Sequence, residues 1–199
     1  MRYYNEGTLR CVLHSDEMMK TWQSCVDSCV QIIGSLADIH CVDIVHRDLH
    51  SGNLLRTKAN TILKSQTELT DIADFGLSVL ATDNISRGRD GKYGVIPYMA
   101  PELFLGKPHT KRSDVYAFGC IMYEILAGHP PFIGDNVLDT LQKQINDDPV
   151  AIGKARDKDD LPKELEQIVH KTLQKLPEDR FQSMEELLAA LEEIQLSKV

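Results

Sequence analysis

Apolar residues recur at steps of three or four over residues 18–40, and this period predicts an amphipathic helix there. Residues 114–127 are apolar nearly all round, which is typical of a helix at the centre of a helical bundle. Gly128 and the prolines that follow it are expected to end this second helix. The pattern therefore places a long helix early in the chain and a buried one near its middle.

The last third of the chain is charged and also has a helical period. Apolar residues on one face predict a helix over 161–176. Ser183 and Glu186 have the spacing of a capping box, so we expect a final helix that begins there and ends near Leu196. Helices therefore dominate the predicted fold.

The predicted β-structure is minor. Residues 54–55 and 72–75 are short apolar runs that favour strands. Residues 56–70 have little periodicity and are expected to form a turn or loop, and residues 79–97 have neither period and predict a long loop. The predicted fold class is α+β, predominantly helical, with a short β element near a polar loop at 46–53.

Composition narrows the class of protein. The chain carries 22 basic and 30 acidic residues, a net charge of −8, which argues against a nucleic-acid or anionic-membrane partner. It has no apolar run of the roughly 20 residues that cross a bilayer, and no signal peptide is recognised. Its five cysteines lack metal-site spacing and are expected to be reduced thiols. We therefore expect a soluble, cytoplasmic protein.

The candidate chemistry begins in the polar loop. Asp48 is followed five residues later by Asn53, so one tight turn can present a base and a metal ligand to the same point. Asp74 comes twenty-one residues after Asn53, at the end of an expected strand. Amide and carboxylate oxygens suit Mg²⁺, which binds few protein oxygens together with phosphates and water.

These residues form part of an ordered set that resembles the eukaryotic protein kinase family, of the Ser/Thr or tyrosine-kinase-like type. His46-Arg47-Asp48 through Asn53 resembles the catalytic loop of the family, and Asp74-Phe75-Gly76 resembles its metal-binding motif. Ala100-Pro101-Glu102 resembles the end of the activation segment, and residues 113–119 resemble the start of the central helix. Arg180 matches the arginine that pairs with the glutamate of the Ala-Pro-Glu motif. The resemblance implies a partial kinase domain over 1–196, from the hinge through the C-lobe, and a tail at 197–199.

The resemblance also implies catalytic roles. Asp48 would accept or orient the substrate hydroxyl proton, and Asn53 and Asp74 would hold Mg²⁺ on ATP. His50 stands where the family usually has lysine or alanine, and it would neutralise the transferring phosphate only when protonated. The expected cofactors are therefore ATP and Mg²⁺.

The adenine site is expected at the hinge backbone near Tyr4, with Leu55 under the ring. No Gly-rich phosphate loop and no lysine strand precede the hinge, so the sequence predicts a kinase C-lobe without an N-lobe. Phosphates held by half a site stay in water, where charge contacts are weak, so we expect weak or absent ATP affinity for these 199 residues alone.

Regulation and structure account for the remaining candidates. Arg47 would bind a phosphate that an upstream kinase places on Ser86 or Tyr93 of the activation loop. Structural roles are expected for five residues, namely His46, Phe75, Glu102, Asp114 and Arg180. Of these, Glu102 and Arg180 are expected to form a buried ion pair, and Asp114 either anchors the catalytic-loop backbone or caps its helix.

Three functional alternatives stay open. The first is a protein kinase acting on protein hydroxyls, with Ser/Thr favoured because Tyr98 replaces the usual tyrosine-kinase tryptophan. The second is a catalytically inactive kinase-derived scaffold, or a fragment of a longer kinase, whose exposed lobe face a partner covers. The third is a small-molecule phosphotransferase, which shares the pattern of residues 48–53 but lacks the landmarks at 100–102 and 113–119.

Overall fold

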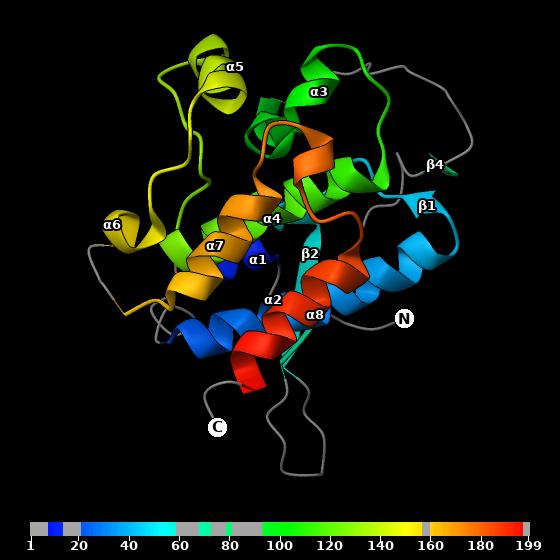
Figure 1. Cartoon of the computed structure of the whole chain (residues 1–199), viewed down its shortest axis with the longest axis vertical. Coiled ribbons are helices and arrows are strands. Elements are labelled where there is room, and N and C mark those ends of the chain that lie inside the picture. The colour runs from blue at the N-terminus through cyan, green and yellow to red at the C-terminus, as the bar shows by residue number, and fades with distance from the viewer. Residues whose placement is uncertain are drawn as a thin grey trace.

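The computed structural model describes residues 8–13, 21–58, 68–72, 79–80, 93–156 and 160–196. Over these residues the chain is predominantly helical, as predicted (Figure 1). The α-helices are α1 (Leu9–Val12), α2 (Trp22–Cys41), α3 (Pro101–Phe104), α4 (Lys111–Ala127), α5 (Val137–Asn146), α6 (Ile152–Arg156), α7 (Lys163–Thr172) and α8 (Met184–Leu196). In this part of the chain, no helix is both long and apolar enough to cross a membrane.

Helix α4 lies at the centre of the molecule, with α2 and α8 side by side along one flank (Figure 1). Every residue from Ser113 to Ala127 is buried, which confirms the prediction drawn from its apolar pattern. Thr110 and Ser113 form a capping box at its start, and Gly128 ends it with a left-handed φ of 84°. Gly119 lets α7 pack closely on α4, because an added Cβ would collide with the side chain of Thr172.

The final helix begins where the sequence predicted, with a modified cap. The Glu186 N–H donates to Ser183 Oγ at 3.2 Å, as a capping box requires. The Glu186 carboxylate, however, accepts from the Gln182 N–H at 2.7 Å, one residue before the expected partner. Two backbone N–H groups at the start of the helix, those of Gln182 and Glu186, therefore have side-chain acceptors.

The strands pair two by two. β2 (Leu54–Lys58) pairs antiparallel with β3 (Glu68–Ile72), and β1 (Ile44–Val45) pairs with β4 (Val79–Leu80). The predicted turn or loop at 56–70 was therefore wrong at both ends, because β2 and β3 extend into it through backbone pairing that polar side chains do not reveal. The long loop predicted for 79–97 likewise contains β4 and a 3₁₀ helix, η2 (Tyr93–Tyr98).

Two helices without a sequence prediction, α5 and α6, follow α4. Asn136 caps α5, since its Oδ1 accepts from the Asp139 N–H at 3.0 Å. The buried residues of helix α5 are the polar Thr140 and Gln144. Its apolar residues therefore do not mark the face that packs on the core, and the sequence pattern did not predict a packed helix.

A half-buried lysine supports the end of α5. Lys175 Nζ donates to the Gln144 carbonyl at 2.8 Å and lies 4.0 Å from the centroid of the Phe132 ring. Burial lowers the pKa of Lys175 from 10.5 to about 8. Between these two values the unfolded chain binds the proton more strongly than the folded chain, so the free energy of unfolding contributed by this group rises with pH.

We expect Lys175→Met to remove this contribution. In urea unfolding, the free energy of unfolding of the wild type should rise between pH 8 and pH 10 relative to that of the variant. Lys171→Met is the matched control, because Lys171 lies 4.0 Å from the Phe181 ring but on an exposed surface. Equal pH dependence in the two variants would contradict the prediction.

Candidate active site

The loop at 46–53 connects β1 to β2 and folds back on itself through Asn53. The Asn53 Nδ2 atom donates to the Asp48 carbonyl at 2.8 Å and lies 3.3 Å from Asp48 Oδ2. Asp48 is buried, and the 3₁₀ helix η1 (Ser51–Asn53) provides the turn between the two residues. The structure thus brings the expected base and an expected metal ligand together, with the amide nitrogen engaged and the oxygen as the atom that asparagine offers to a cation.

Asp114, in the first turn of α4, holds the start of this loop. Its Oδ2 accepts from the His46 N–H at 2.7 Å and lies 2.9 Å from His40 Nε2, and its Oδ1 accepts from the Arg47 N–H at 3.1 Å. Arg47 has a left-handed φ of 70°, which is unfavourable for a residue with a side chain. The carboxylate therefore stabilises a strained turn, whereas Thr110, not Asp114, caps the helix.

We expect Asp114→Asn to lower the free energy of unfolding by about 2 kcal/mol, since hydrogen bonds to a buried charged group are worth roughly 1.5–3 kcal/mol. The amide would present an N–H₂ group to one of the donors that the carboxylate now satisfies. Urea unfolding measures the loss, with Asp38→Asn on the exposed face of α2 as the control. An unchanged midpoint would show that Asp114 does not support the loop.

His50 is fixed by the backbone two residues on. Its Nδ1 accepts from the Gly52 N–H at 3.0 Å, and its Nε2 lies 3.9 Å from Asp48 Oδ1. An acceptor at Nδ1 leaves the proton of the neutral ring on Nε2, so in this geometry Nε2 is a hydrogen-bond donor. Gly52 fits beneath the ring because a Cβ there would lie 2.9 Å from His50 Cε1 and Nδ1.

A largely buried network that the sequence did not predict connects the loop to distant parts of the described chain. The Tyr98 hydroxyl donates to Glu124 at 2.7 Å, lies 3.1 Å from Ser51 Oγ and accepts from Arg10 at 3.2 Å. Burial, with the Glu124 carboxylate, raises the pKa of Tyr98 far above its ordinary value, so the hydroxyl keeps its proton. These residues come from four distant segments, and no local spacing signals their contact.

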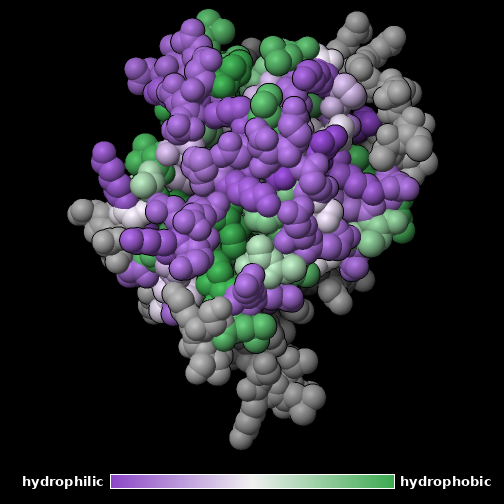
Figure 2. Space-filling view, viewed as in Figure 1, coloured by the Kyte–Doolittle hydropathy of each residue, from purple (hydrophilic) through white to green (hydrophobic). Residues whose placement is uncertain are grey.

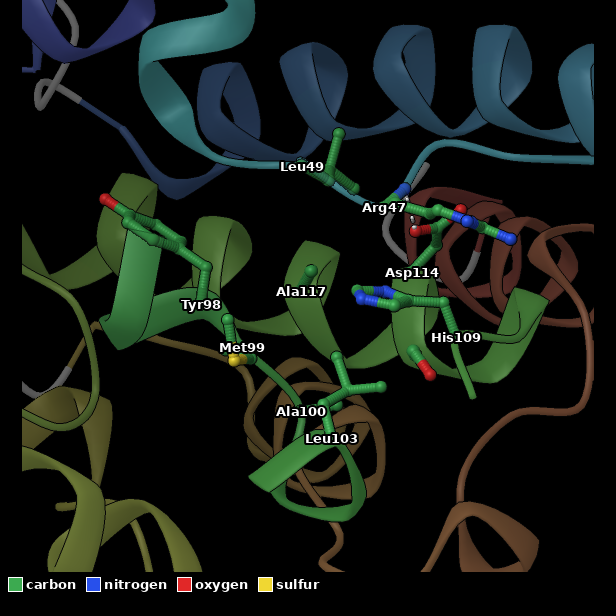
Figure 3. Close-up of a pocket in the computed structure, with 10 residues that line it drawn as sticks. Arg47, Leu49, Tyr98, Met99, Ala100, Leu103, His109, Asp114 and Ala117 are labelled. Carbon is green, nitrogen blue, oxygen red and sulfur yellow. Dashed lines mark hydrogen bonds between the residues drawn. The ribbon is translucent and has the colours of Figure 1, made fainter. Parts of the chain in front are cut away.

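A small pocket lies against the other side of the loop (Figure 3). Arg47 and His109 line one end of it, beside Asp114, and Tyr98 lies at the other end (Figure 3). Burial lowers the pKa of His109, and the negative charge of Asp114 opposes this shift without cancelling it. His109 is therefore a residue of this site that sequence reasoning missed.

The expected pair of Glu102 and Arg180 is in contact. The guanidinium forks onto the carboxylate, with Nη2 2.7 Å from Oε2 and Nη1 2.9 Å from Oε1. Both side chains are buried, and Ser113 Oγ adds a hydrogen bond to Oε1 at 3.0 Å. Burial raises the pKa of Glu102, but the hydrogen bonds and charge of Arg180 outweigh it and leave that pKa below its ordinary value.

Several candidates stand apart from this description. Tyr4, Asp74, Phe75 and Ser86 lie outside the described residues, as does the side chain of Tyr93. Leu55 is half-buried on β2, where it forms a β-bridge with Thr8. The second metal ligand, the hinge contact and the phosphorylation of the activation loop therefore stay predictions.

Comparison with known proteins decides between the kinds of phosphotransferase that the loop allows. The model of the protein kinase domain family matches residues 1–190. This chain belongs to the protein kinase family.

The kinase is similar to bacterial members of the family. It is 31% identical over 192 residues to the serine/threonine-protein kinase PknB of Mycobacterium leprae and 32% identical over 196 residues to that of Mycolicibacterium smegmatis. Each match covers 96% of this chain and 29% of the relative. A probable serine/threonine-protein kinase of Streptomyces coelicolor is 29% identical over 194 residues, 96% of this chain and 27% of the relative. The kinase thus spans less than a third of the length of these curated relatives.

Proposed function

We propose that this kinase transfers the terminal phosphate of ATP to serine or threonine hydroxyls of a protein substrate. The observation that carries the proposal is the hydrogen-bonded turn that holds the Asp48 carboxylate beside the Asn53 amide. Membership of the family and the names of its serine/threonine-kinase relatives support the reaction and the acceptor. Both the activity and the acceptor are proposals for this chain.

Asp48 is the group that receives or orients the hydroxyl proton. Asp48 is 4% exposed, so few waters compete with a substrate hydroxyl for its carboxylate oxygens. The hydrogen bond from Asn53 and the anchoring of the loop by Asp114 fix its direction before a substrate arrives. Such positioning, rather than covalent chemistry, is what phosphoryl transfer asks of the protein.

The oxygen donors of the site fit the expected cofactor. Asn53 Oδ1 and, from the sequence, Asp74 would hold Mg²⁺, a cation that prefers a few protein oxygens. When bound with ATP, Mg²⁺ neutralises charge on the phosphates. His50 Nε2, which carries the ring proton, is the neighbouring donor for a phosphate oxygen.

The direct test is phosphate transfer by the purified chain. The chain is incubated with millimolar ATP, Mg²⁺ and casein, and phosphorylated residues are identified by mass spectrometry. We expect phosphoserine or phosphothreonine that requires Mg²⁺. Phosphotyrosine alone would contradict the proposed acceptor. A complete absence of transfer would contradict the proposed activity and favour the scaffold alternative.

A further inference from the structure

Arg156, the last residue of α6, has a buried guanidinium group. The helix lies at one edge of the molecule (Figure 1), and hydrophilic side chains reach the surface around it (Figure 2). The Arg156 side chain is nevertheless only 4% exposed. Arginine keeps its positive charge in proteins, and a charge withdrawn from water is costly unless a partner compensates it. The partners of this guanidinium are therefore informative.

The chain gives Arg156 only a distant partner. Its Nη1 atom lies 3.9 Å from Asp160 Oδ1, beyond the roughly 2.7–2.9 Å of a charge-assisted hydrogen bond. The Asp160 side chain is 49% exposed, so water weakens its attraction for the guanidinium. Within the described ranges this is the one ion pair of Arg156, and its buried Nη1 atom has no hydrogen-bond acceptor.

Arg180 provides the comparison within the same fold. Its guanidinium is also buried, and all five of its N–H groups have acceptors: two donate to the Glu102 carboxylate and three to backbone carbonyls. The two arginines are alike in burial but not in their partners. The fold thus satisfies one buried guanidinium completely and leaves the other with a donor that the described residues do not use.

The start of α2 lies near the Arg156 guanidinium and adds positive potential. Burial raises the pKa of the Cys25 thiol to about 11, and the charge of Arg156 opposes this rise, so the guanidinium acts on the first turns of α2. The N-terminal end of a helix has a positive partial charge, and the first turn of α2 contains no acidic residue. An anion beside Arg156 is therefore favoured by this helix as well.

The acidic residue of α7 that contacts α6 is used at the opposite end of α6. Glu166 Oε1 accepts from the Ile152 N–H at 2.6 Å. The Ile152 side chain is buried, and α6 packs against α4. These contacts fix the helix on the core, so the burial of Arg156 is a property of the packed structure, and Glu166 is not its counter-ion.

We propose that the Arg156 guanidinium binds a phosphate group, which takes the place of the distant Asp160 carboxylate. A guanidinium can donate two parallel hydrogen bonds to two oxygens of a phosphate, which supplies the acceptor that Nη1 lacks. Asp160 can leave at little cost, because its half-exposed carboxylate turns into water. The group is either inorganic phosphate or a phosphate monoester on a protein, and the binding is independent of phosphate transfer by the chain.

The first test is calorimetry of the full 199-residue chain with inorganic phosphate at constant ionic strength. We expect binding that Arg156→Lys weakens at least about tenfold, because lysine keeps the charge but cannot form the fork. Lys154→Met is the matched control, since it removes a charge from an exposed side chain of the same helix, and it should bind like the wild type. No binding at about 10 mM phosphate, or equal weakening in both variants, would overturn the proposal.

Asp160→Asn tests the displacement. The neutral amide competes less for the guanidinium than the carboxylate does, so the variant should bind phosphate at least about twofold more tightly. Weaker binding would show that Asp160 does not make way for the anion, and it would overturn the proposed arrangement. A blocked phosphoserine, titrated in parallel, identifies the source: tighter binding than inorganic phosphate supports a phosphoprotein, and weaker binding supports the small anion.

Arg156→Met tests whether the guanidinium lacks a partner in the chain itself. In phosphate-free buffer, the variant should unfold in urea at the same midpoint as the wild type or at a higher one, because an uncompensated buried charge is removed. Added phosphate should raise the midpoint of the wild type more than that of the variant. A lower midpoint of the variant without phosphate would show that the fold already satisfies Arg156, and it would overturn the proposal.

Discussion

Replacing Arg180 with methionine is expected to lower the free energy of unfolding by about 3–5 kcal/mol, because the change leaves the Glu102 carboxylate buried and unpaired. All five N–H groups of this guanidinium have acceptors: Nη1 and Nη2 each donate to Glu102, and the remaining three donate to the carbonyls of Arg112, Gln174 and Lys175. The Arg180 Cζ atom also lies 4.8 Å from the centroid of the Tyr116 ring. One side chain thus joins α3, the start of α4 and the segment after α7.

Conservative variants separate charge from geometry at this site. Arg180→Lys keeps a positive charge but cannot make the fork or reach the three carbonyls, so it should recover only a small part of the lost stability. Arg180→Met with Glu102→Gln should be more stable than Arg180→Met alone, because the orphan charge is removed. Urea unfolding of all four proteins measures these differences. A double variant that is no more stable than Arg180→Met alone would contradict the ion-pair interpretation.

The pair of Glu102 and Arg180 also predicts that the chain loses stability at acid pH. Since the pKa of Glu102 is below its ordinary value in the folded chain, the folded state binds this proton less strongly than the unfolded state. The stability that the ionised Glu102 contributes is fully present above the unfolded pKa of about 4.3. It is lost as the pH falls through the lower pKa that Glu102 has in the folded chain. The Arg180→Met variant should lose this part of the acid dependence.

Asp48→Asn is expected to reduce the rate of phosphate transfer by at least about 100-fold, the usual lower bound for removing a general acid or base. Asparagine has nearly the same shape and can still accept the Asn53 hydrogen bond, so the loop should keep its geometry. The amide, however, cannot take up the hydroxyl proton. Single-turnover transfer at millimolar ATP measures the effect, and urea unfolding verifies that stability is retained.

Asp43→Asn is the matched control for this prediction. Asp43 lies five residues earlier, is exposed and is paired with Lys111 at 2.6 Å, and its left-handed φ of 58° is well tolerated by asparagine. Its transfer rate should stay within about twofold of the wild type, since exposed ion pairs contribute little. Equal transfer rates in the two variants would show that Asp48 has no role in phosphate transfer.

Sequence patterns predicted the parts of this fold whose signals are local. The all-round apolar character of residues 114–127 predicted the buried α4, and the five-residue spacing of Asp48 and Asn53 predicted that the two side chains meet. The contact between Glu102 and Arg180 joins residues 78 apart, and only resemblance to a family suggested it. Long-range pairs leave no trace in local periodicity.

The missed features share a physical cause. Helix α5 packs through Thr140 and Gln144, so its hydrophobic period describes the outer face and not the core. Strand β2 pairs with β3 by backbone hydrogen bonds in a hairpin whose polar side chains do not alternate with apolar ones. The bonds from Tyr98 to Ser51 and Arg10 span 47 and 88 residues, and each depends on the completed fold.

The distance between Glu102 and Arg180 along the chain has a consequence during synthesis. Glu102 leaves the ribosome 78 residues before its partner, and at about 5–20 residues per second this delay is roughly 4–16 s. Over that interval the carboxylate has no guanidinium to enter the interior with, so α3 cannot settle against α4. The nascent chain therefore completes this packing only after Arg180 has emerged, and until then it depends on chaperones more than a domain closed by local contacts would.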